Sequence, residues 1–157
     1  MNREQVLEAL IASLRAELDA AQHMVQMSLD EATHRESKAE NKYDTRSLEA
    51  SYLASGQGAR VLALRRLVTW AESTSSAAPT RAALGSLVTL EDDETRTMWA
   101  ILLPDGGGHR LTVGGRELVV LTPDSPLGRA LLGLEADEEC EVHAKGGKRT
   151  WTVLSLD

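Results

Sequence analysis

The sequence lacks phenylalanine, has a single cysteine, and contains neither proline nor glycine before Gly56. The one cysteine, Cys140, cannot form a disulfide within the chain. No histidine or base stands beside it, so we interpret it as a small buried hydrophobic residue. No apolar run approaches the roughly 18 residues of a membrane-spanning helix, and the amino terminus carries acids where a signal peptide would be basic and then apolar. We therefore expect a cytoplasmic protein with no membrane partner.

Positive charge is also scarce. The 157 residues include 17 Lys and Arg against 24 Asp and Glu, which gives a net charge of −7 at pH 7. Affinity for nucleic acid over a broad surface depends on clustered Lys and Arg, so this balance argues against such a surface but leaves room for a local contact. Residues 1–76 carry nine bases and eleven acids, and residues 77–157 carry eight bases and thirteen acids. The acidity is therefore concentrated in the second half.

The first half is organised by two apolar stripes with helical spacing. Apolar residues recur at intervals of three and four over residues 6–34 and again over residues 50–71. Each stripe is typical of one face of a long amphipathic helix. The pattern predicts an antiparallel coiled-coil hairpin over residues 1–76, with arms of about 34 residues and roughly 50 Å. Gly56 and Gly58 each cost the second helix about 1 kcal/mol relative to alanine, so we expect a bend or close packing there.

The segment between the stripes, Arg35–Asp44, segregates its charges by sign. Acids recur every four residues, and so do bases; the acids are Glu36, Glu40 and Asp44, and the bases are Lys38, Lys42 and Arg46. On a helix, neighbours four apart gain roughly 0.2–0.5 kcal/mol from opposite charge and lose about as much from like charge. An ordinary solvated face would mix its signs. The segregation therefore indicates charges that face something outside the chain.

The second half has the periodicity of strands. A small, polar segment from Ser73 to Pro79 predicts a linker near residues 77–80, followed by a sheet domain over residues 81–157. Strands are predicted at Ser86–Leu90, Thr97–Leu103, Glu117–Leu121, Glu138–Ala144 and Thr150–Leu156. The second of these is almost continuously apolar, so we expect it near the centre of the sheet. The predicted class is α+β, a helical hairpin followed by a small, mostly antiparallel sheet.

One short helix interrupts the predicted strands, in the segment Asp124–Gly133. Ser125 is a natural N-cap, Pro126 suits the first helical position, and Gly133 suits the residue just past the end. Capping alone explains this pattern without any further role. Asp124, beside the helix start, would also stabilise the helix dipole.

Three segments together resemble one known family. They are the acidic tip with its Glu-Asn and Tyr, the stretch Gly85–Asp92, and the segment Asp124–Gly133. In this combination the chain resembles the Gre transcript cleavage factors of bacterial RNA polymerase, over nearly its whole length and most specifically in the two later segments. The resemblance implies a coiled-coil finger and a sheet domain with the fold of FK506-binding proteins. It also implies that the sheet domain docks on the rim of the polymerase's secondary channel through Asp124, Ser125 and Pro126.

The resemblance further implies that two acids at the hairpin tip, near residues 36–44, help the polymerase hold a catalytic magnesium ion. The polymerase then cuts the extruded 3′ end of a backtracked transcript. Glu40, directly before Asn41, matches the second acid, Glu36 is the nearest match for the first, and Asp44 is a substitute candidate. The family places its two acids three apart, whereas Glu36 and Glu40 are four apart. Four bases would contact the RNA or the channel wall: Arg35, Lys38, Lys42 and Arg46.

Several hypotheses stay open. The chain is either a factor that stimulates cleavage by the polymerase or a secondary-channel regulator or inhibitor that does not. In both cases it is an accessory factor and not an enzyme, acts as a monomer, binds no metal alone and meets the nascent RNA through the polymerase. A prolyl isomerase is disfavoured because Trp99 and Trp151 are the only aromatic residues in 77–157. A structural coiled-coil adaptor is the remaining alternative. The scattered histidines lack metal-ligand spacing, so they support no other catalytic function.

Overall fold

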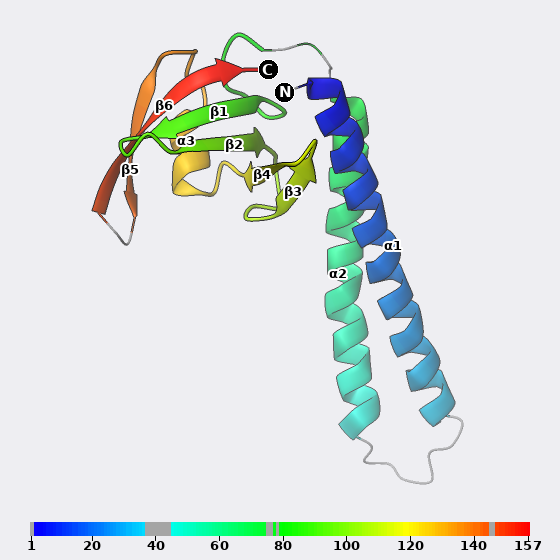
Figure 1. Cartoon of the computed structure of the whole chain (residues 1–157). Coiled ribbons are helices and arrows are strands. Elements are labelled where there is room, and N and C mark those ends of the chain that lie inside the picture. The colour runs from blue at the N-terminus through cyan, green and yellow to red at the C-terminus, as the bar shows by residue number, and fades with distance from the viewer. Residues whose placement is uncertain (1, 37–44, 75–76, 78, 145–146) are drawn as a thin grey trace. The chain divides into compact units, whose positions relative to one another are not determined.

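The computed structural model describes residues 2–36, 45–74, 77, 79–144 and 147–157 (Figure 1). Within these residues the helices are α1 (Arg3–Glu36), α2 (Thr45–Ser73) and α3 (Pro126–Leu131). The strands are β1 (Leu87–Asp92), β2 (Thr97–Leu102), β3 (Arg110–Val113), β4 (Arg116–Leu121), β5 (Glu139–Ala144) and β6 (Gly147–Leu156). The fold class is α+β, as predicted.

The chain divides into two compact units. The helical unit is Ile11–Glu72, and the sheet unit combines Met1–Leu10 with Ser73–Asp157. The start of α1 is tied to the sheet, because Arg3 Nη1 donates to the carbonyls of Gly85 at 2.6 Å and Asp157 at 2.7 Å. Burial lowers the pKa of the Arg3 guanidinium, although the charge of Asp157 opposes this shift.

In the helical unit α1 and α2 run in opposite directions. Arg15 Nη2 lies 2.6 Å from Glu72 Oε1 near the end of α2, whereas Glu17, one half-turn further along α1, lies 3.7 Å from Arg60 in an earlier turn of α2. The predicted stripes supply much of the interior, and their buried members include Leu14, Ala21, Val61, Leu64, Val68 and Ala71. Leu67 is buried although it lies outside the predicted stripe, whereas Leu29 within it is exposed. The prediction of two long paired helices is confirmed.

The two glycines of α2 differ from expectation. α2 is continuous through Gly56 and Gly58, and a Cβ built at either position meets nothing within 4 Å. The close packing expected at these positions is absent. Each glycine therefore gives the backbone of α2 extra conformational freedom, although no neighbouring atom would exclude a side chain at that position.

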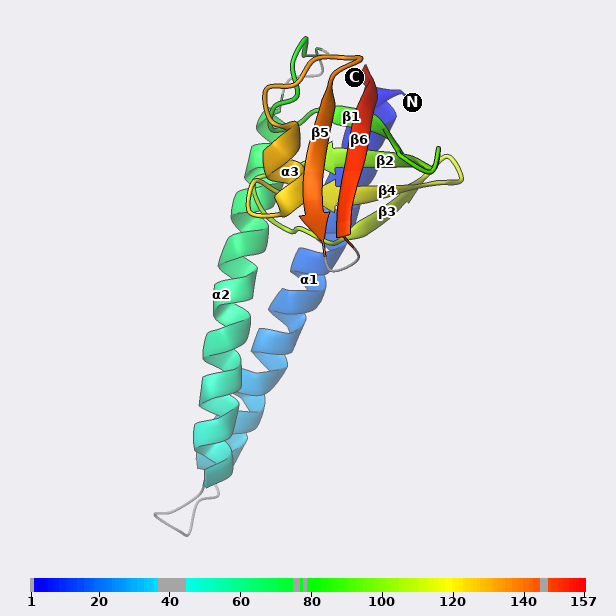
Figure 2. The same ribbon diagram turned by 90° about the vertical axis from the view of Figure 1, so that its left-hand side faces the viewer.

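The sheet has six strands in the order β3-β4-β2-β1-β6-β5 (Figure 2). Neighbouring strands are antiparallel except β2 and β4, which pair in parallel from Trp99–Leu118 to Leu102–Leu121. This agrees with the predicted, mostly antiparallel sheet, and the parallel pair arises because the chain leaves β2, forms the edge strand β3 and returns as β4 between β2 and β3. As predicted, the apolar strand β2 lies inside the sheet, between β1 and β4.

Strand β3 is the element that the sequence patterns missed. It has only four residues, of which Leu111 and Val113 are half-buried, so its apolar signal is weak. Its turn into β4 is Gly114-Gly115, with φ of 58° and 77° at the two residues. Positive φ at both central residues is the geometry of a tight two-residue hairpin turn. This glycine pair was the signal that would have placed the strand.

One face of the sheet forms a core with α3. The fully buried members of this core include Val88, Leu90, Ala100, Leu102, Leu131 and Val153. Leu131 comes from α3, which lies beside β5 (Figure 2). Packing of Leu131 on the sheet thus fixes α3 and, with it, the turn that precedes α3.

Among the described residues, no helix is both long enough and apolar enough to cross a bilayer.

Candidate functional site

The start of α3 is a rigid turn built around Ser125. The Ser125 hydroxyl accepts a hydrogen bond from the Gly128 N–H at 3.0 Å and donates one to the Thr122 carbonyl at 2.8 Å. The Ser125 backbone is extended, with φ −77° and ψ 145°, and Pro126 opens the helix. These are the features of an N-cap, so the capping prediction is confirmed. The helix stop is confirmed as well, because Gly133 has φ 88°.

Gly128 makes this turn possible in a way that the sequence patterns did not reveal. A Cβ at this position would lie 2.1 Å from the Thr122 carbonyl oxygen and 2.7 Å from Ser125 Oγ. Both are far inside normal contact distances. Gly128 is therefore required by the close approach of backbone and cap, and its early place in a short capped helix was the available signal.

The same turn presents a carboxylate to solvent. Asp124 and Pro126 are exposed, whereas Ser125 between them is half-buried. Within the described part of the chain, the Asp124 carboxylate takes part in no hydrogen bond and no ion pair. The turn thus holds an available negative charge and an exposed proline ring on a fixed backbone.

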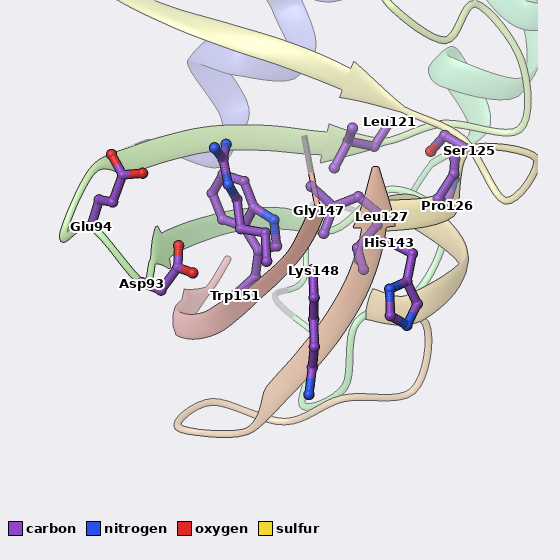
Figure 3. A pocket seen from close by; sticks show the side chains of 12 residues that line it. Asp93, Glu94, Leu121, Ser125, Pro126, Leu127, His143, Gly147, Lys148 and Trp151 are labelled. Atoms are coloured by element: carbon purple, nitrogen blue, oxygen red, sulfur yellow. The ribbon is translucent and has the colours of Figure 1, made fainter. Parts of the chain in front are cut away.

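A pocket of about 630 Å³ opens beside this turn (Figure 3). Its walls come from the β1–β2 turn, the end of β4, the start of α3 and the β5–β6 hairpin. The apolar lining residues are Leu121, Pro126, Leu127, Val142 and Trp151. The polar ones are Asp93, Glu94, Ser125, His143, Lys148 and Arg149. Apolar walls with a few polar groups, in this range of volumes, are usual for binding sites.

A buried carboxylate at the end of β1 holds one wall of the pocket. Asp92 accepts hydrogen bonds from the N–H groups of Glu94 at 3.0 Å and Arg96 at 2.9 Å, and from Arg96 Nε at 2.9 Å. Burial alone would raise the pKa of the Asp92 carboxyl, but the hydrogen bonds from the Arg96 side chain and the two N–H groups together lower it. The turn that carries Asp93 into the pocket wall is thereby fixed.

Cys140 belongs to this core and not to a reactive site. It is half-buried and packs against the apolar cluster under α3. Burial raises the pKa of the Cys140 thiol, which keeps it protonated near neutral pH and makes it a poor nucleophile. Its interpretation as a hydrophobic residue is supported.

The predicted tip residues are not part of this site description. Lys38, Glu40, Lys42 and Asp44 are outside the described residues, and so are the side chains of Arg35, Glu36 and Arg46, whose backbones belong to α1 and α2. Of the predicted site residues, the structure therefore brings together Asp124, Ser125 and Pro126. Among the described residues, no group of three or more His, Cys, Asp or Glu side chains is arranged to hold a metal ion.

The fold and the turn define a class of protein in which a two-helix arm precedes a mixed sheet that presents a capped acidic turn. The sequence model of the family described as "Transcription elongation factor, GreA/GreB, C-term" matches residues 77–157. The chain belongs to the GreA/GreB family of transcription elongation factors. The matched region contains both the Asp124 turn and the pocket.

Individual relatives are more distant. The chain is 34% identical to Transcription elongation factor GreB of Pseudomonas aeruginosa over 80 residues, which span 50% of this chain and 44% of that protein. The solved structure of Thermus aquaticus Gfh1 is 19% identical, with coverage of 95% and 94% and a TM-score of 0.40. A GreA/GreB factor from Nitrosomonas europaea is also 19% identical, with coverage of 59% and 77% and a TM-score of 0.38.

Proposed function

We propose that this chain binds bacterial RNA polymerase at the secondary channel and stimulates the polymerase's intrinsic cleavage of backtracked RNA. The observation that carries the proposal is the Asp124 turn. It lies inside the region matched by the GreA/GreB family, and its carboxylate is exposed and unpaired within the described residues. An exposed charge held on a fixed backbone binds a partner with little further loss of conformational entropy.

Docking would use three neighbouring residues in different ways. Asp124 supplies the charge, and Pro126 supplies an exposed apolar ring beside it. Ser125 is turned inward to its cap bonds and therefore positions the other two. Loss of the Asp124 charge should weaken polymerase binding without unfolding the turn.

The chemistry is assigned to the tip carboxylates of Glu36 and Glu40, with Asp44 as a substitute. Carboxylates are the ligand type that magnesium prefers, and one or two protein carboxylates usually suffice for it. A magnesium ion shared with the polymerase would supply charge stabilisation and an activated water at the phosphodiester. The chain's own part is to bring two carboxylates to that site, so the chain is an accessory factor with no metal of its own.

The basic residues near the tip would serve binding. Arg35, Lys38, Lys42 and Arg46 offer positive charge to the RNA backbone or to the channel wall, in a chain whose net charge is −7. A local cationic stripe on an acidic protein favours a confined contact with RNA over general nucleic-acid affinity. In this proposal the chain meets the nascent RNA inside the polymerase. It acts there as a single copy, and the binding takes place in the cytoplasm.

A second function is favoured by the tip spacing. Glu36 and Glu40 are four residues apart, where the resemblance leads one to expect three. A shared ion needs both carboxylates at defined positions, and a tip with altered spacing would occupy the channel without promoting cleavage. The alternative is therefore a regulator or inhibitor that binds by the same turn and does not stimulate cleavage.

The two remaining alternatives have less support. Trp151 is the one aromatic residue among those that line the described pocket, which is a poor match for the aromatic peptide pocket of a prolyl isomerase. A coiled-coil adaptor would leave the exposed Asp124 turn without a use. Neither alternative accounts for the family match over residues 77–157.

The proposal is tested by binding to RNA polymerase core enzyme with Asp124→Asn and, as a matched control, Asp105→Asn. Asp105 is an exposed aspartate in another turn of the sheet unit, and its Oδ1 accepts from the Gly106 N–H, a bond that asparagine retains. We expect Asp124→Asn to weaken binding several-fold, as for a charged interface contact, and Asp105→Asn to bind like wild type. Equal affinities for all three proteins would remove the docking assignment.

A further inference from the structure

We infer that the helical unit binds a second copy of this chain, with two hairpins side by side and α1 of each copy against α2 of the other. The partner is the chain itself, so the inference does not depend on the proposed function. It assigns a binding surface to Met24 and Met27 of α1 and to small residues of α2. This surface belongs to the helical unit Ile11–Glu72, whereas the Asp124 turn belongs to the sheet unit.

The α1 part of the surface lies on the side of the hairpin where Glu17 pairs with Arg60. Residues three, four or seven positions apart share one side of a helix. Met24 follows Glu17 by seven residues, and Met27 follows Met24 by three. Both methionines are exposed, at 51% and 55%. Methionine is usually a buried residue type, so two neighbouring exposed methionines form an apolar patch that suits a protein partner.

The α2 part of the surface is a shallow groove of small residues on the same side. Gly56 precedes Arg60 by four residues and Ala63 follows it by three, with Ala59 between them at the same spacings. Gly56 and Ala59 are exposed and Ala63 is half-buried. A Cβ built at Gly56 meets nothing within 4 Å. The hairpin itself therefore leaves this groove open.

The two parts of the surface are at matching heights. α1 and α2 are antiparallel (Figure 1), and the two ion pairs between them place Met24 and Met27 level with the part of α2 around Gly56 and Ala59. A twofold axis that runs along the hairpin keeps every residue at its own height. The methionines of one copy then meet the small residues of the other, as large and small side chains do in an antiparallel four-helix bundle.

The charges of the two helices select this arrangement. Residues 16–34 contain four acids and no Lys or Arg, whereas residues 50–71 contain three arginines and no acid. Asp19, Arg65 and Arg66 are exposed and take part in no hydrogen bond or ion pair within the described part of the chain. Contact of α1 with the other copy's α2 brings opposite charges together, whereas contact of α1 with α1 would bring acids together. A second copy matches both helices at once.

The first test is sedimentation equilibrium of the full chain from about 5 to about 200 µM, a range over which a weak dimer forms. The proteins are wild type, Met27→Gln and the control Leu62→Gln. Leu62 has the same exposed fraction as Met27, 55%, but it lies two residues from Arg60 and so on another side of α2.

We expect wild type to dimerise and Met27→Gln to raise the dissociation constant of the dimer at least about tenfold, because a twofold dimer loses the apolar contact twice. Leu62→Gln should match wild type. Thermal unfolding followed by circular dichroism checks that each variant retains the hairpin.

A second pair of variants tests the groove. Gly56→Met and Gly58→Met both add a side chain where the single chain has open space, and both gain the same helix propensity. Gly58 lies two residues from Gly56 and so outside the groove. Gly56→Met should therefore abolish the dimer, and Gly58→Met should leave it intact.

Three results would overturn the inference. Wild type that stays monomeric over the whole concentration range has no such surface. Equal losses in Met27→Gln and Leu62→Gln would place the contact on another side of the hairpin. A dissociation constant that falls as KCl rises from about 50 to about 400 mM would mean that like charges meet, which contradicts the pairing of α1 with α2. None of these results bears on polymerase binding by the Asp124 turn, although the single copy proposed to act on polymerase requires that the dimer dissociate first.

Discussion

The sheet unit and the helical unit differ in how closely their sequences constrain their structures. In the sheet unit single side chains have defined partners: Asp92 holds the β1–β2 turn, Ser125 caps α3, and Gly128 fits where no Cβ can. In the helical unit, the pairing of the two helices rests on burial of a repeated apolar stripe. Gly56 and Gly58 touch nothing that would exclude a side chain. The family match falls on the sheet unit, whereas the proposed chemistry belongs to the tip. Under the proposed function, the family match and the cleavage chemistry therefore fall on different parts of the chain.

The strongest test of this contrast is Gly128→Ala. The added methyl group would overlap the Thr122 carbonyl oxygen, so we expect the free energy of unfolding to fall by about 3 kcal/mol, the upper part of the range for overpacking. Urea unfolding followed by tryptophan fluorescence measures the loss. The variant should also lose polymerase affinity, because the cap and the Asp124 turn move together. A variant as stable as wild type would show that the turn tolerates a side chain.

A second, smaller effect is expected for Asp92→Asn. The hydrogen bonds to Asp92 lower the pKa of its carboxyl in the folded protein. Its charge therefore contributes stability that is fully present above the unfolded pKa of about 3.9 and is lost as pH falls through the lower folded value. The asparagine variant should melt below wild type near neutral pH, partly because Thr95 in the same turn has φ 60° and must be held there.

The pH profile distinguishes this account from a simple loss of packing. The difference in melting temperature between wild type and Asp92→Asn should shrink as the pH falls below about 4, because both proteins then lack the charge. A difference that stayed constant down to about pH 2 would mean that the carboxylate charge has no part in holding the turn.

The smallest expected effect has the opposite sign. Gly58→Ala lies in a helix with open space at the new Cβ, so we expect stabilisation by up to about 1 kcal/mol. Gly133→Ala is the matched control. A Cβ at Gly133 would also meet open space, but the φ of 88° at this position is unfavourable for any residue with a side chain. Thermal unfolding of the two variants should give shifts in opposite directions. Destabilisation by Gly58→Ala would show that the helical unit is packed as specifically as the sheet unit.

Local patterns predicted the local elements well. The bounds of α3 followed from Ser125, Pro126 and Gly133, each of which acts only on its own neighbourhood in the chain. The position of β2 inside the sheet followed from its continuous apolar run. β3 was missed because a short edge strand with two half-buried apolar residues gives little periodicity.

Features that join distant segments were not predictable in this way. The parallel pairing of β2 with β4 depends on where the chain returns after β3, which no residue type specifies. The pocket brings together Asp93, Leu127 and Trp151 from three separate elements.

The central claim is tested most directly by RNA cleavage in stalled, backtracked bacterial elongation complexes, with magnesium present and this protein added or omitted. The account predicts faster release of short 3′ fragments with wild type, loss of that stimulation in Glu36→Ala and Glu40→Ala with binding retained, and loss of both in Asp124→Lys. Binding of wild type without faster cleavage would contradict the claim and identify the chain as the channel-occupying regulator.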